Sequence, residues 1–347
     1  MEIGILREVK IGEKRVALTP QGCIPLLDAG HQLYIEKQAG ERAGFPDAEY
    51  QQLGVNLCQT AQDVYARSKL LVKVKEPQEQ ELLRFRSDHL LFCYLHLGGN
   101  RELCENLKKI GLTAYGFETI SFKGATPCLA PMSAIAGRVA VQIGTRLLHS
   151  QLGGKGALLG GTSTAPEGKV IVLGAGIAGF EAAALALHMG ALVQLIDINP
   201  QALARAKEKL PGIQTFLSRP DLIESLIPSA DLLVGAVYQR GKRATKVVSL
   251  KQVALMSPGS VIVDIAIDQG GCIEGSRPCT HMEPGYVEGE VMFSAVTNLP
   301  AAVPHSASIA LSKSIGPYLL ALAEGQLNHP GLESGKNLEG GKLFIEL

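Results

Sequence analysis

Three glycines, Gly174, Gly176 and Gly179, follow an apolar run in the spacing G-x-G-x-x-G, and an Ala-rich helical stretch comes after them. A second apolar run ends in Asp197, which stands 18 residues after Gly179. In a unit of this kind the first glycine permits a tight turn, the second lets the backbone approach a pyrophosphate, and the third lets the helix pack on the strand. The acidic residue is placed to accept hydrogen bonds from ribose hydroxyls. The pattern predicts a dinucleotide site; the weaker alternative is a glycine-rich turn without a ligand.

Four side chains suited to chemistry stand close after apolar runs that are typical of strands. Lys75 follows LLVKV, His96 follows LLFCYL and Asp268 follows VIVDIAI, while Arg15 stands in the loop after the first run. Taken singly, each has an ordinary explanation, such as a half-buried histidine, a turn cap or a surface charge. Ligands bind at the carboxyl ends of parallel strands, so the joint placement of these four beside a dinucleotide site favours a functional role.

These residue types point to one class of reaction, which is hydride exchange between a nicotinamide cofactor and a small acid. Histidine has an ordinary pKa of about 6.5, so His96 is suited to the accompanying proton transfer. Arg15 and Lys75 can hold a carboxylate, the arginine through its planar fork and the lysine as a point charge. Asp268 can polarise a water molecule or stabilise a cationic imine. The residues alone favour oxidation of a small amino or hydroxy acid.

The composition excludes several other classes of protein. Lys plus Arg and Asp plus Glu both number 33, so the basic bias usual in nucleic-acid-binding proteins is missing. The N-terminus has no signal-type apolar core, and no run of 18 apolar residues indicates a membrane span. Seven cysteines without C-x-x-C spacing indicate reduced thiols in a cytoplasmic protein rather than disulfides or a zinc site.

The length of 347 residues is typical of about two domains. Apolar runs alternate with helical patterns in both halves, which predicts two α/β, doubly wound domains. A long helix is expected over 131–149, and a later helix over 306–326 is expected to return to the first domain. The Gly-rich residues 328–347 are expected to form a loosely held tail. The expected strands are 3–6, 32–36, 70–74, 90–95 and 113–117, then 170–173, 193–196, 232–237, 260–267 and 291–296.

Motifs along nearly the whole chain resemble those of the alanine dehydrogenase family, which also includes the soluble part of the proton-translocating nicotinamide nucleotide transhydrogenase. YLHL and APMS resemble the dehydrogenase branch more than the transhydrogenase branch. The motifs are GILREVKIGEKRVALTP (4–20), LVKVKEP (71–77), YLHL (94–97), LAPMSAIAGR (129–138), LGAGIAG (173–179), LIDIN (195–199), VIVDIAIDQGG (261–271), TNLPAAVP (297–304) and ALSKSIGPYLLALA (310–323).

The resemblance implies two Rossmann-like domains with the active site in a cleft between them. The catalytic domain is then discontinuous, 1–128 with 303–347, and the NAD-binding domain is 129–302. Arg15 and Lys75 match the family's ligands for the substrate carboxylate, His96 matches its acid/base, and Asp268 matches its second catalytic acid. Besides the glycine turn, the residues that match cofactor contacts are Ser133, Ile177, Ala178, Asp197, Ser218, Val237, Tyr238, Ile265, Ala266, Ile267, Arg277, Val296, Thr297, Asn298 and Leu299.

The implied reaction is the reversible, NAD-dependent conversion of L-alanine and water to pyruvate and ammonium, by a homo-oligomer that is usually a hexamer. Ala321 stands where some members have an acidic metal ligand, so no metal is implied. Ala202 and the basic loop 240–246 depart from the family pattern near the cofactor, while Asp197 favours NAD over NADP. The alternatives are a dehydrogenase of another small amino acid or of glyoxylate, a catalytically weak NAD(H)-binding sensor, and a transhydrogenase-like subunit.

Overall fold

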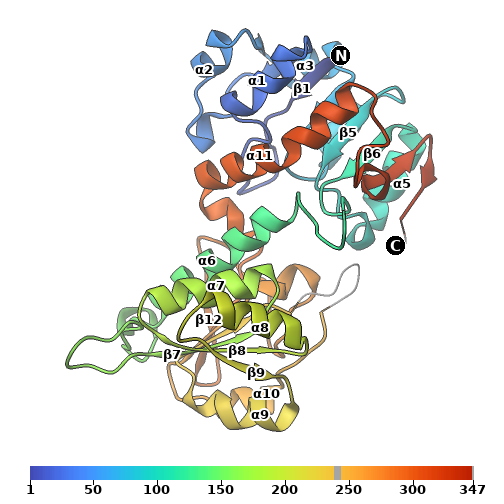
Figure 1. Cartoon of the computed structure of the whole chain (residues 1–347). Coiled ribbons are helices and arrows are strands. Elements are labelled where there is room, and N and C mark those ends of the chain that lie inside the picture. Colours follow the sequence, from blue (N-terminus) through green and yellow to red (C-terminus); the bar gives the residue numbers. More distant parts are fainter. Residues whose placement is uncertain (238–243, 346–347) are drawn as a thin grey trace. The chain divides into compact units, whose positions relative to one another are not determined.

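The computed structural model describes residues 1–237 and 244–345, and the chain divides into two compact units (Figure 1). Unit 1 comprises Met1–Met132 with Val303–Leu347, and unit 2 comprises Ser133–Ala302. The first boundary lies between Met132 and Ser133 and falls within helix α6 (Ala130–Leu147). The family resemblance implied a boundary between residues 128 and 129. In the described ranges, no helix is long and apolar enough to cross a membrane.

The strands of unit 1 are β1 (Glu2–Ile5), β2 (Gln32–Glu36), β3 (Asn56–Cys58), β4 (Leu70–Val72), β5 (Leu90–Cys93), β6 (Thr113–Gly116), β14 (Lys336–Glu339) and β15 (Lys342–Leu343). They form one sheet in the order β15-β14-β6-β5-β4-β1-β2-β3, and β1 to β6 pair in parallel. The chain runs outward from β1 to β3 and then returns to β4 beside β1. The strand order therefore reverses between β1 and β4, which confirms the doubly wound topology. At such a reversal, ligands bind outside the carboxyl ends of the strands.

The helices of unit 1 are α1 (Pro20–Asp28), α2 (Asp47–Gln52), α3 (Ala61–Arg67), α4 (Glu79–Leu82), α5 (Arg101–Ile110), α11 (Pro304–Ala323) and α12 (Leu332–Gly335). Apolar side chains of α3 and α5, such as Tyr65 and Leu107, enter one core with β4 and β5. Helix α11 returns from unit 2 and packs on α1, as Figure 1 shows. Its Ser308 and Ser312 hydroxyls accept hydrogen bonds from the backbone of the segment that precedes α1.

The C-terminal residues are part of the sheet of unit 1, so the expectation of a loosely held tail was wrong. Strand β14 pairs antiparallel with β6 and adds β15 at the sheet edge. Leu338 is buried in the same apolar core as α3 and α5, and Asn337 is buried beside it. The alternation in this segment is too short, and the glycines around it too many, for the sequence pattern to reveal a strand.

The strands of unit 2 are β7 (Lys169–Leu173), β8 (Leu192–Asp197), β9 (Gln214–Leu217), β10 (Leu232–Gly235), β11 (Val261–Asp264), β12 (Tyr286–Glu288) and β13 (Val291–Ser294). Their order is β12-β13-β11-β10-β7-β8-β9, with all neighbours parallel except β12 and β13. The order reverses between β7 and β10, so this unit is also doubly wound. The carboxyl ends of β7 and β10 mark its expected ligand edge.

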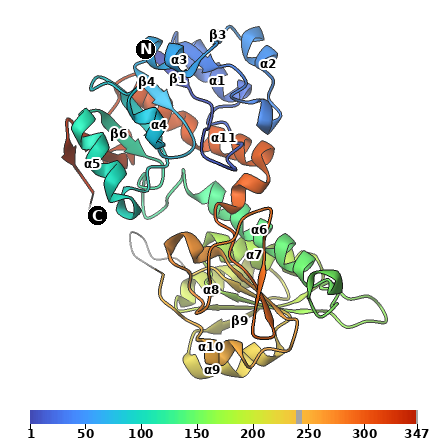
Figure 2. The same ribbon diagram turned by 180° about the vertical axis from the view of Figure 1, so that it is seen from behind.

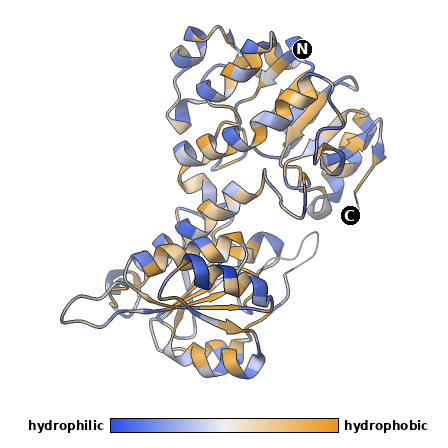
Figure 3. Cartoon of the chain, in the orientation of Figure 1, coloured by the Kyte–Doolittle hydropathy of each residue, from blue (hydrophilic) through white to orange (hydrophobic). Residues whose placement is uncertain are grey.

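The helices named in unit 2 after α6 are α7 (Ile177–His188), α8 (Pro200–Lys209), α9 (Pro220–Leu226) and α10 (Leu250–Val253). Figures 1 and 2 show α7 and α8 on one face of the sheet and α9 and α10 on the other. The strands between these layers are coloured mainly as hydrophobic in Figure 3, and α8 mainly as hydrophilic. This is the pattern of parallel strands buried on both faces and helices exposed on one side.

Two local expectations are corrected by the structure. The strand expected over 260–267 ends at Asp264 and continues as a 3-10 turn, Ile265–Gln269, because the Asp264 carboxylate accepts a hydrogen bond from the backbone of Ala266. The short strands β3, β9 and β12 were not expected from the sequence, since each is partly exposed and has no apolar run.

Candidate active site

The glycine turn joins β7 to α7 at the reversal point of unit 2. Gly174 has φ of 101°, and a Cβ there would lie 2.6 Å from the carbonyl oxygen of Ala236. A Cβ on Gly179 would lie 1.8 Å from the carbonyl oxygen of Gly174. At Gly176, by contrast, a Cβ would meet no atom within 4 Å. The fold itself therefore requires the outer two glycines, whereas Gly176 leaves open space at the N-terminus of α7, where a pyrophosphate can approach the backbone.

Asp197 ends β8 beside this turn. One of its carboxylate oxygens accepts a hydrogen bond from the backbone N–H of Ala175, and the other accepts one from Asn199 at 2.7 Å. The backbone N–H of Ser218 donates to the carbonyl oxygen of Asp197 at 2.8 Å. The half-buried Asp197 carboxylate is thus fixed next to the turn, with lone pairs left for ribose hydroxyls. Ala202 is buried in α8 and supplies no cation there.

The other residues matched to cofactor contacts gather mainly in loops after the strands of unit 2. Val237 follows β10, the turn that contains Ile265, Ala266 and Ile267 follows β11, and the run Val296, Thr297, Asn298 and Leu299 follows β13. Ser133 lies inside the first turn of α6. Ile177 and Ala178 begin α7. Tyr238 lies outside the described residues.

Two of these positions have a distinctive local geometry. Asn298 has a left-handed backbone with φ of 57°, and Nε2 of His281 donates to its carbonyl oxygen at 3.2 Å. The guanidinium of Arg277 lies 4.0 Å from the ring centroid of Tyr286, whose hydroxyl accepts the backbone N–H of Arg277 at 2.7 Å. Cation–π stacking of this kind holds the arginine side chain over the edge of the sheet.

Two aspartates near the end of β11 take different places. Asp264 is buried, and its oxygens accept hydrogen bonds from the backbone of Ala266 and Ile273 and from the hydroxyl of Ser276. It therefore holds the loop together. Asp268 lies in the 3-10 turn with its side chain exposed, so its carboxylate is available to a ligand.

In unit 1, Arg15 follows β1 at the reversal point of the sheet and is held by Glu13. Its Nε and Nη2 donate to the two oxygens of Glu13 at 2.8 and 2.6 Å, and its Nη1 contacts Sδ of Met132 at 3.1 Å. Both residues are buried. Burial alone would lower the pKa of Arg15, but the hydrogen bonds and charge of Glu13 raise it above its ordinary value. Arg15 is therefore a permanent, oriented cation, and the sequence pattern did not reveal its partner.

Lys75 follows β4, the other strand of this reversal point. Its side chain is half-buried, and its backbone N–H donates to Oε1 of Glu8 at 3.4 Å, as does that of Val74 at 2.5 Å. The neighbouring Lys73 is fully buried, and its ammonium donates to both oxygens of Glu81 at 2.6 and 2.8 Å. The two lysines of LVKVKEP therefore differ: Lys73 belongs to a buried ion pair, and Lys75 is only half-buried.

His96 stands just beyond β5, the strand next to β4. Its backbone is left-handed, with φ of 48°, and its N–H donates to Oε1 of Glu118 at 2.7 Å. The N–H of Leu95 donates to both oxygens of the same carboxylate at 3.2 Å. The imidazole is exposed and stacks on Tyr94, with ring centroids 5.8 Å apart. Glu118 thus stabilises an uncommon backbone conformation that directs a histidine outward.

Arg15, Lys75 and His96 therefore lie in loops that follow three adjacent strands, β1, β4 and β5. The order of these strands brings together two cations and an imidazole at one edge of the sheet. Such a set can bind a carboxylate and move a proton beside it.

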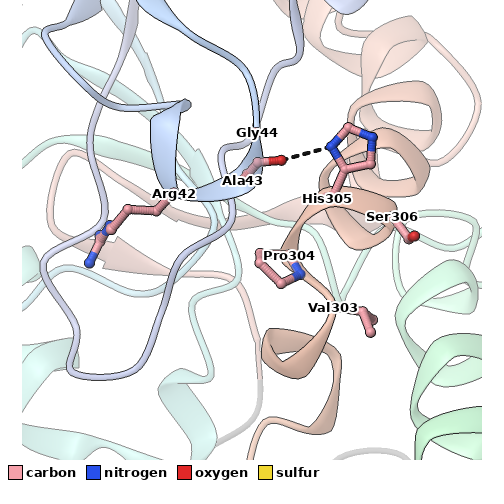
Figure 4. Close-up of a pocket in the computed structure, with 7 residues that line it drawn as sticks. All are labelled: Arg42, Ala43, Gly44, Val303, Pro304, His305 and Ser306. Carbon is pink, nitrogen blue, oxygen red and sulfur yellow. Dashed lines mark hydrogen bonds between the residues drawn. The ribbon is translucent and has the colours of Figure 1, made fainter.

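A separate pocket of about 440 Å³ opens at the N-terminus of α11 in unit 1. Figure 4 shows that Nδ1 of His305 donates to the carbonyl oxygen of Ala43 across it, at 2.8 Å. None of the expected site residues that the structure describes lines this pocket. Its lining residues are Arg42, Ala43, Gly44, Val303, Pro304, His305 and Ser306.

The potential metal ligands of the described ranges form no cluster of three or more histidine, cysteine, aspartate or glutamate side chains. The seven cysteines, all of which the structure describes, are free thiols and buried. Their burial raises the pKa of thiols such as Cys23 and Cys128 to about 12, so these thiols are protonated at neutral pH.

Comparison with known proteins gives a consistent result over the full length. Two family models match, "Alanine dehydrogenase/PNT, N-terminal domain" over residues 4–136 and "Alanine dehydrogenase/PNT, C-terminal domain" over residues 140–345. The alanine dehydrogenase of Mycolicibacterium smegmatis is 41% identical, with 100% of this chain and 95% of that protein covered. The alanine dehydrogenase of Bacillus subtilis is 40% identical, with 100% and 93% covered.

Solved structures match equally broadly. An L-alanine dehydrogenase matches with a TM-score of 0.95 and 43% identity, covering 99% of this chain and 96% of that one. A transhydrogenase from Sinorhizobium meliloti matches with a TM-score of 0.86 and 25% identity, covering 99% and 98%.

Proposed function

The chain belongs to the alanine dehydrogenase/PNT family, and from that premise we propose that it catalyses the reversible, NAD-dependent oxidation of L-alanine to pyruvate and ammonium. One observation carries the proposal: full-length similarity to alanine dehydrogenases coincides with an intact set of Arg15, Lys75, His96 and Asp268. A catalytically weak NAD(H)-binding homologue would have no need to keep all four.

The residues of unit 2 fit a nicotinamide dinucleotide. The open space at Gly176 accommodates a pyrophosphate at the N-terminus of α7, and the fixed carboxylate of Asp197 suits the hydroxyls of a ribose. The charge of Asp197 opposes a 2′-phosphate, which favours NAD over NADP. The loop 240–246 carries basic residues, but residues 238–243 lie outside the described part of the chain.

On the substrate side, Arg15 and Lys75 bind the carboxylate of L-alanine and thereby orient its Cα–H bond. Loss of that hydrogen as hydride, the chemistry that bound NAD supplies, turns the amine into an imine, which water hydrolyses to pyruvate and ammonium. His96 takes the proton from the attacking water and returns a proton to the departing nitrogen. Asp268 orients the water or stabilises the cationic imine. Positioning of this kind supplies much of the rate, since effective molarities of well-oriented groups reach about 10⁵ M or more.

Assembly and location are further parts of the proposal. By family resemblance the chain acts as a homo-oligomer, and a hexamer is expected. Seven unpaired, buried thiols suit a reducing compartment such as the cytoplasm. A mass measurement in solution checks the oligomeric state.

A substrate panel tests the proposed function. NADH oxidation is measured with ammonium and pyruvate, and then with glyoxylate and larger keto acids in place of pyruvate. The expected result is the highest kcat/KM with pyruvate, and with NADH rather than NADPH. A higher value with another keto acid would identify a dehydrogenase of a different amino acid, and tight NADH binding without any turnover would identify the sensor.

A further inference from the structure

Glu8 is a buried carboxyl group in the loop after β1, and the catalytic scheme does not use it. Its Oε1 accepts the backbone N–H groups of Val74 and Lys75, at 2.5 and 3.4 Å. Its Oε2 accepts no hydrogen bond from the described part of the chain and lies 3.7 Å from Nζ of Lys73. Glu8 therefore holds the backbone from which Lys75 extends, and one of its oxygens is poorly compensated as an anion.

Several charged or titratable groups surround Glu8, from its own loop, from the residues after β4, and from β5 and α4. The nearest cation, Lys73, is already bound by Glu81, which limits what it offers to Glu8. Cys93 on β5 is a neutral thiol, because burial raises its pKa well above the ordinary value. The groups that face or contact Glu8 are Lys73 and the Lys75 backbone after β4, Glu13 and Arg15 in its own loop, Glu81 on α4, Cys93 on β5, and Arg42, which donates to the carbonyl oxygen of Glu8.

Among the charged side chains around and including Glu8, the buried ones are three carboxyls, Glu8, Glu13 and Glu81, and only two cations, Arg15 and Lys73. With every carboxyl ionised, the buried set has an excess negative charge. Burial accordingly raises the pKa of Glu8 to about 7, and the like charges of Glu13 and Glu81 add to the effect while Lys73 opposes it. With Glu8 protonated, the buried set is neutral.

We propose that Glu8 takes up a proton when the substrate carboxylate binds at Arg15 and Lys75, so that substrate affinity falls as the pH rises above neutrality. This inference rests on the proposed function. Glu8 interacts electrostatically with Arg15, and it is hydrogen-bonded to the backbone of Lys75. A new anion at these two cations repels an ionised Glu8 and favours its protonated form. The free and bound enzyme therefore differ in the number of protons they hold, which makes binding depend on pH.

The direction of the effect follows from this difference. Well below pH 7 Glu8 is already protonated in the free enzyme, so pyruvate binds without proton uptake and its affinity is constant. Above pH 7 binding requires proton uptake, and the affinity falls until the pH exceeds the pKa of Glu8 in the complex. The total loss is about tenfold for each unit by which the bound carboxylate raises that pKa.

Calorimetry of the enzyme–NADH complex tests the proposal. Pyruvate is titrated in without ammonium, so that no turnover occurs, from pH 6 to pH 9 and in two buffers of different ionisation enthalpy. For the wild type we expect net proton uptake near pH 8 and a dissociation constant that rises between pH 7 and pH 9. Repeating the titration with His96→Gln removes any part of the proton uptake that is due to the imidazole.

Glu8→Gln is the decisive variant, because glutamine keeps an oxygen for the Val74 N–H and resembles the protonated acid. It is expected to lose the Glu8 share of proton uptake and to bind pyruvate at pH 9 nearly as well as at pH 6. Glu76→Gln is the matched control. Burial opposes ionisation of Glu76, but its hydrogen bond to Lys10 and the charges of Lys10 and Lys75 together outweigh burial and lower its pKa. Glu76 therefore stays ionised across the range, and its loss should leave the slope unchanged.

The possible failures are distinguishable. If Glu8→Gln binds pyruvate with the wild-type slope and proton uptake, the proposal is overturned and the proposed function stands. If the wild type binds NADH but fails to bind pyruvate at every pH, both the proposal and the proposed function are overturned. If Glu8→Gln does not fold, infrared difference spectra of the wild type at pH 8 decide: pyruvate must increase the signal of protonated carboxyl, and no increase overturns the proposal.

Discussion

At the scale of single residues, each residue that we assign to the substrate in unit 1 donates hydrogen bonds to a glutamate that supports it. Glu13 orients the Arg15 guanidinium, Glu8 holds the backbone at Lys75, and Glu118 holds the backbone at His96. These glutamates therefore position the Arg15 guanidinium and the backbone of Lys75 and His96 before a substrate arrives. Preorganisation of this kind is how a site avoids reorganisation during reaction.

His96→Ala tests the acid/base role. We expect kcat to fall by about 10²-fold or more, because no other group described at this strand end replaces the imidazole. NADH affinity, measured by fluorescence, should persist, since the glycine turn belongs to the other unit. His188→Ala removes an exposed histidine at the end of α7 and should leave kcat unchanged. Full activity of His96→Ala would remove this residue from the mechanism.

The sequence indicated candidate polar side chains at strand ends, but it did not indicate the groups that support them. Arg15, Lys75, His96 and Asp268 were selected because each follows a strand. Glu13 and Glu118 were not selected, because their roles depend on which loops the sheet order brings together. Asp264 and Asp268 both follow apolar residues, and only the structure separates the buried anchor from the exposed carboxylate.

At the scale of elements, the β7–turn–α7 unit separates glycines needed for folding from a glycine that leaves room for a ligand. The long, apolar strands and this turn were predictable, since burial on both faces and glycine spacing are local signals. Strands β3, β9, β12 and β14 were not predictable, because each is short, is partly exposed and lacks the apolar run that marks the predicted strands.

Alanine substitutions in the turn make this separation measurable. Gly176→Ala adds a methyl group that meets no protein atom within 4 Å, so its melting temperature should stay close to that of the wild type. Its NADH affinity should fall at least about tenfold, because the methyl group occupies the approach of the pyrophosphate. Gly179→Ala should instead destabilise the fold, since its Cβ would meet the Gly174 carbonyl oxygen at 1.8 Å. Unchanged NADH binding by Gly176→Ala would contradict this assignment.

The C-terminal strand is expected to contribute to stability. Leu338→Ala leaves a cavity in the core of unit 1 and should cost about 2–5 kcal/mol in the free energy of unfolding, measured with urea. Leu327→Ala, at a side chain that is 51% exposed, should change it by less than about 0.5 kcal/mol. Equal effects of the two substitutions would mean that β14 is not part of the stable sheet.

At the scale of the whole molecule, two doubly wound sheets each place their polar residues at a point where strand order reverses. In unit 1 this point lies between β1 and β4, and in unit 2 between β7 and β10. The α/β class and the two sheets were predicted from the sequence and are confirmed. The arrangement in unit 1 buries several charged side chains near β1 and β4, among them Glu8 and Lys73, and we expect them to affect stability as well as binding.

The buried carboxyl of Glu8 should make stability depend on pH. Its pKa is about 7 in the folded chain and near 4.5 when unfolded, so the folded state binds more protons between these values. Its contribution is fully present below pH 4.5 and is lost as the pH rises through 7, by up to about 3 kcal/mol. Urea unfolding of the wild type and Glu8→Gln at pH 5 and pH 8 measures the difference. Identical pH profiles for the two proteins would refute it.

The most direct test of the central claim is the forward reaction with product analysis. The enzyme is incubated with L-alanine and NAD, and NADH, pyruvate and ammonium are quantified. We predict equal amounts of the three products, and a higher kcat/KM for L-alanine than for glycine, L-serine or larger amino acids. Absence of NADH formation from any amino acid, with NAD(H) still bound, would contradict the assignment as an amino-acid dehydrogenase.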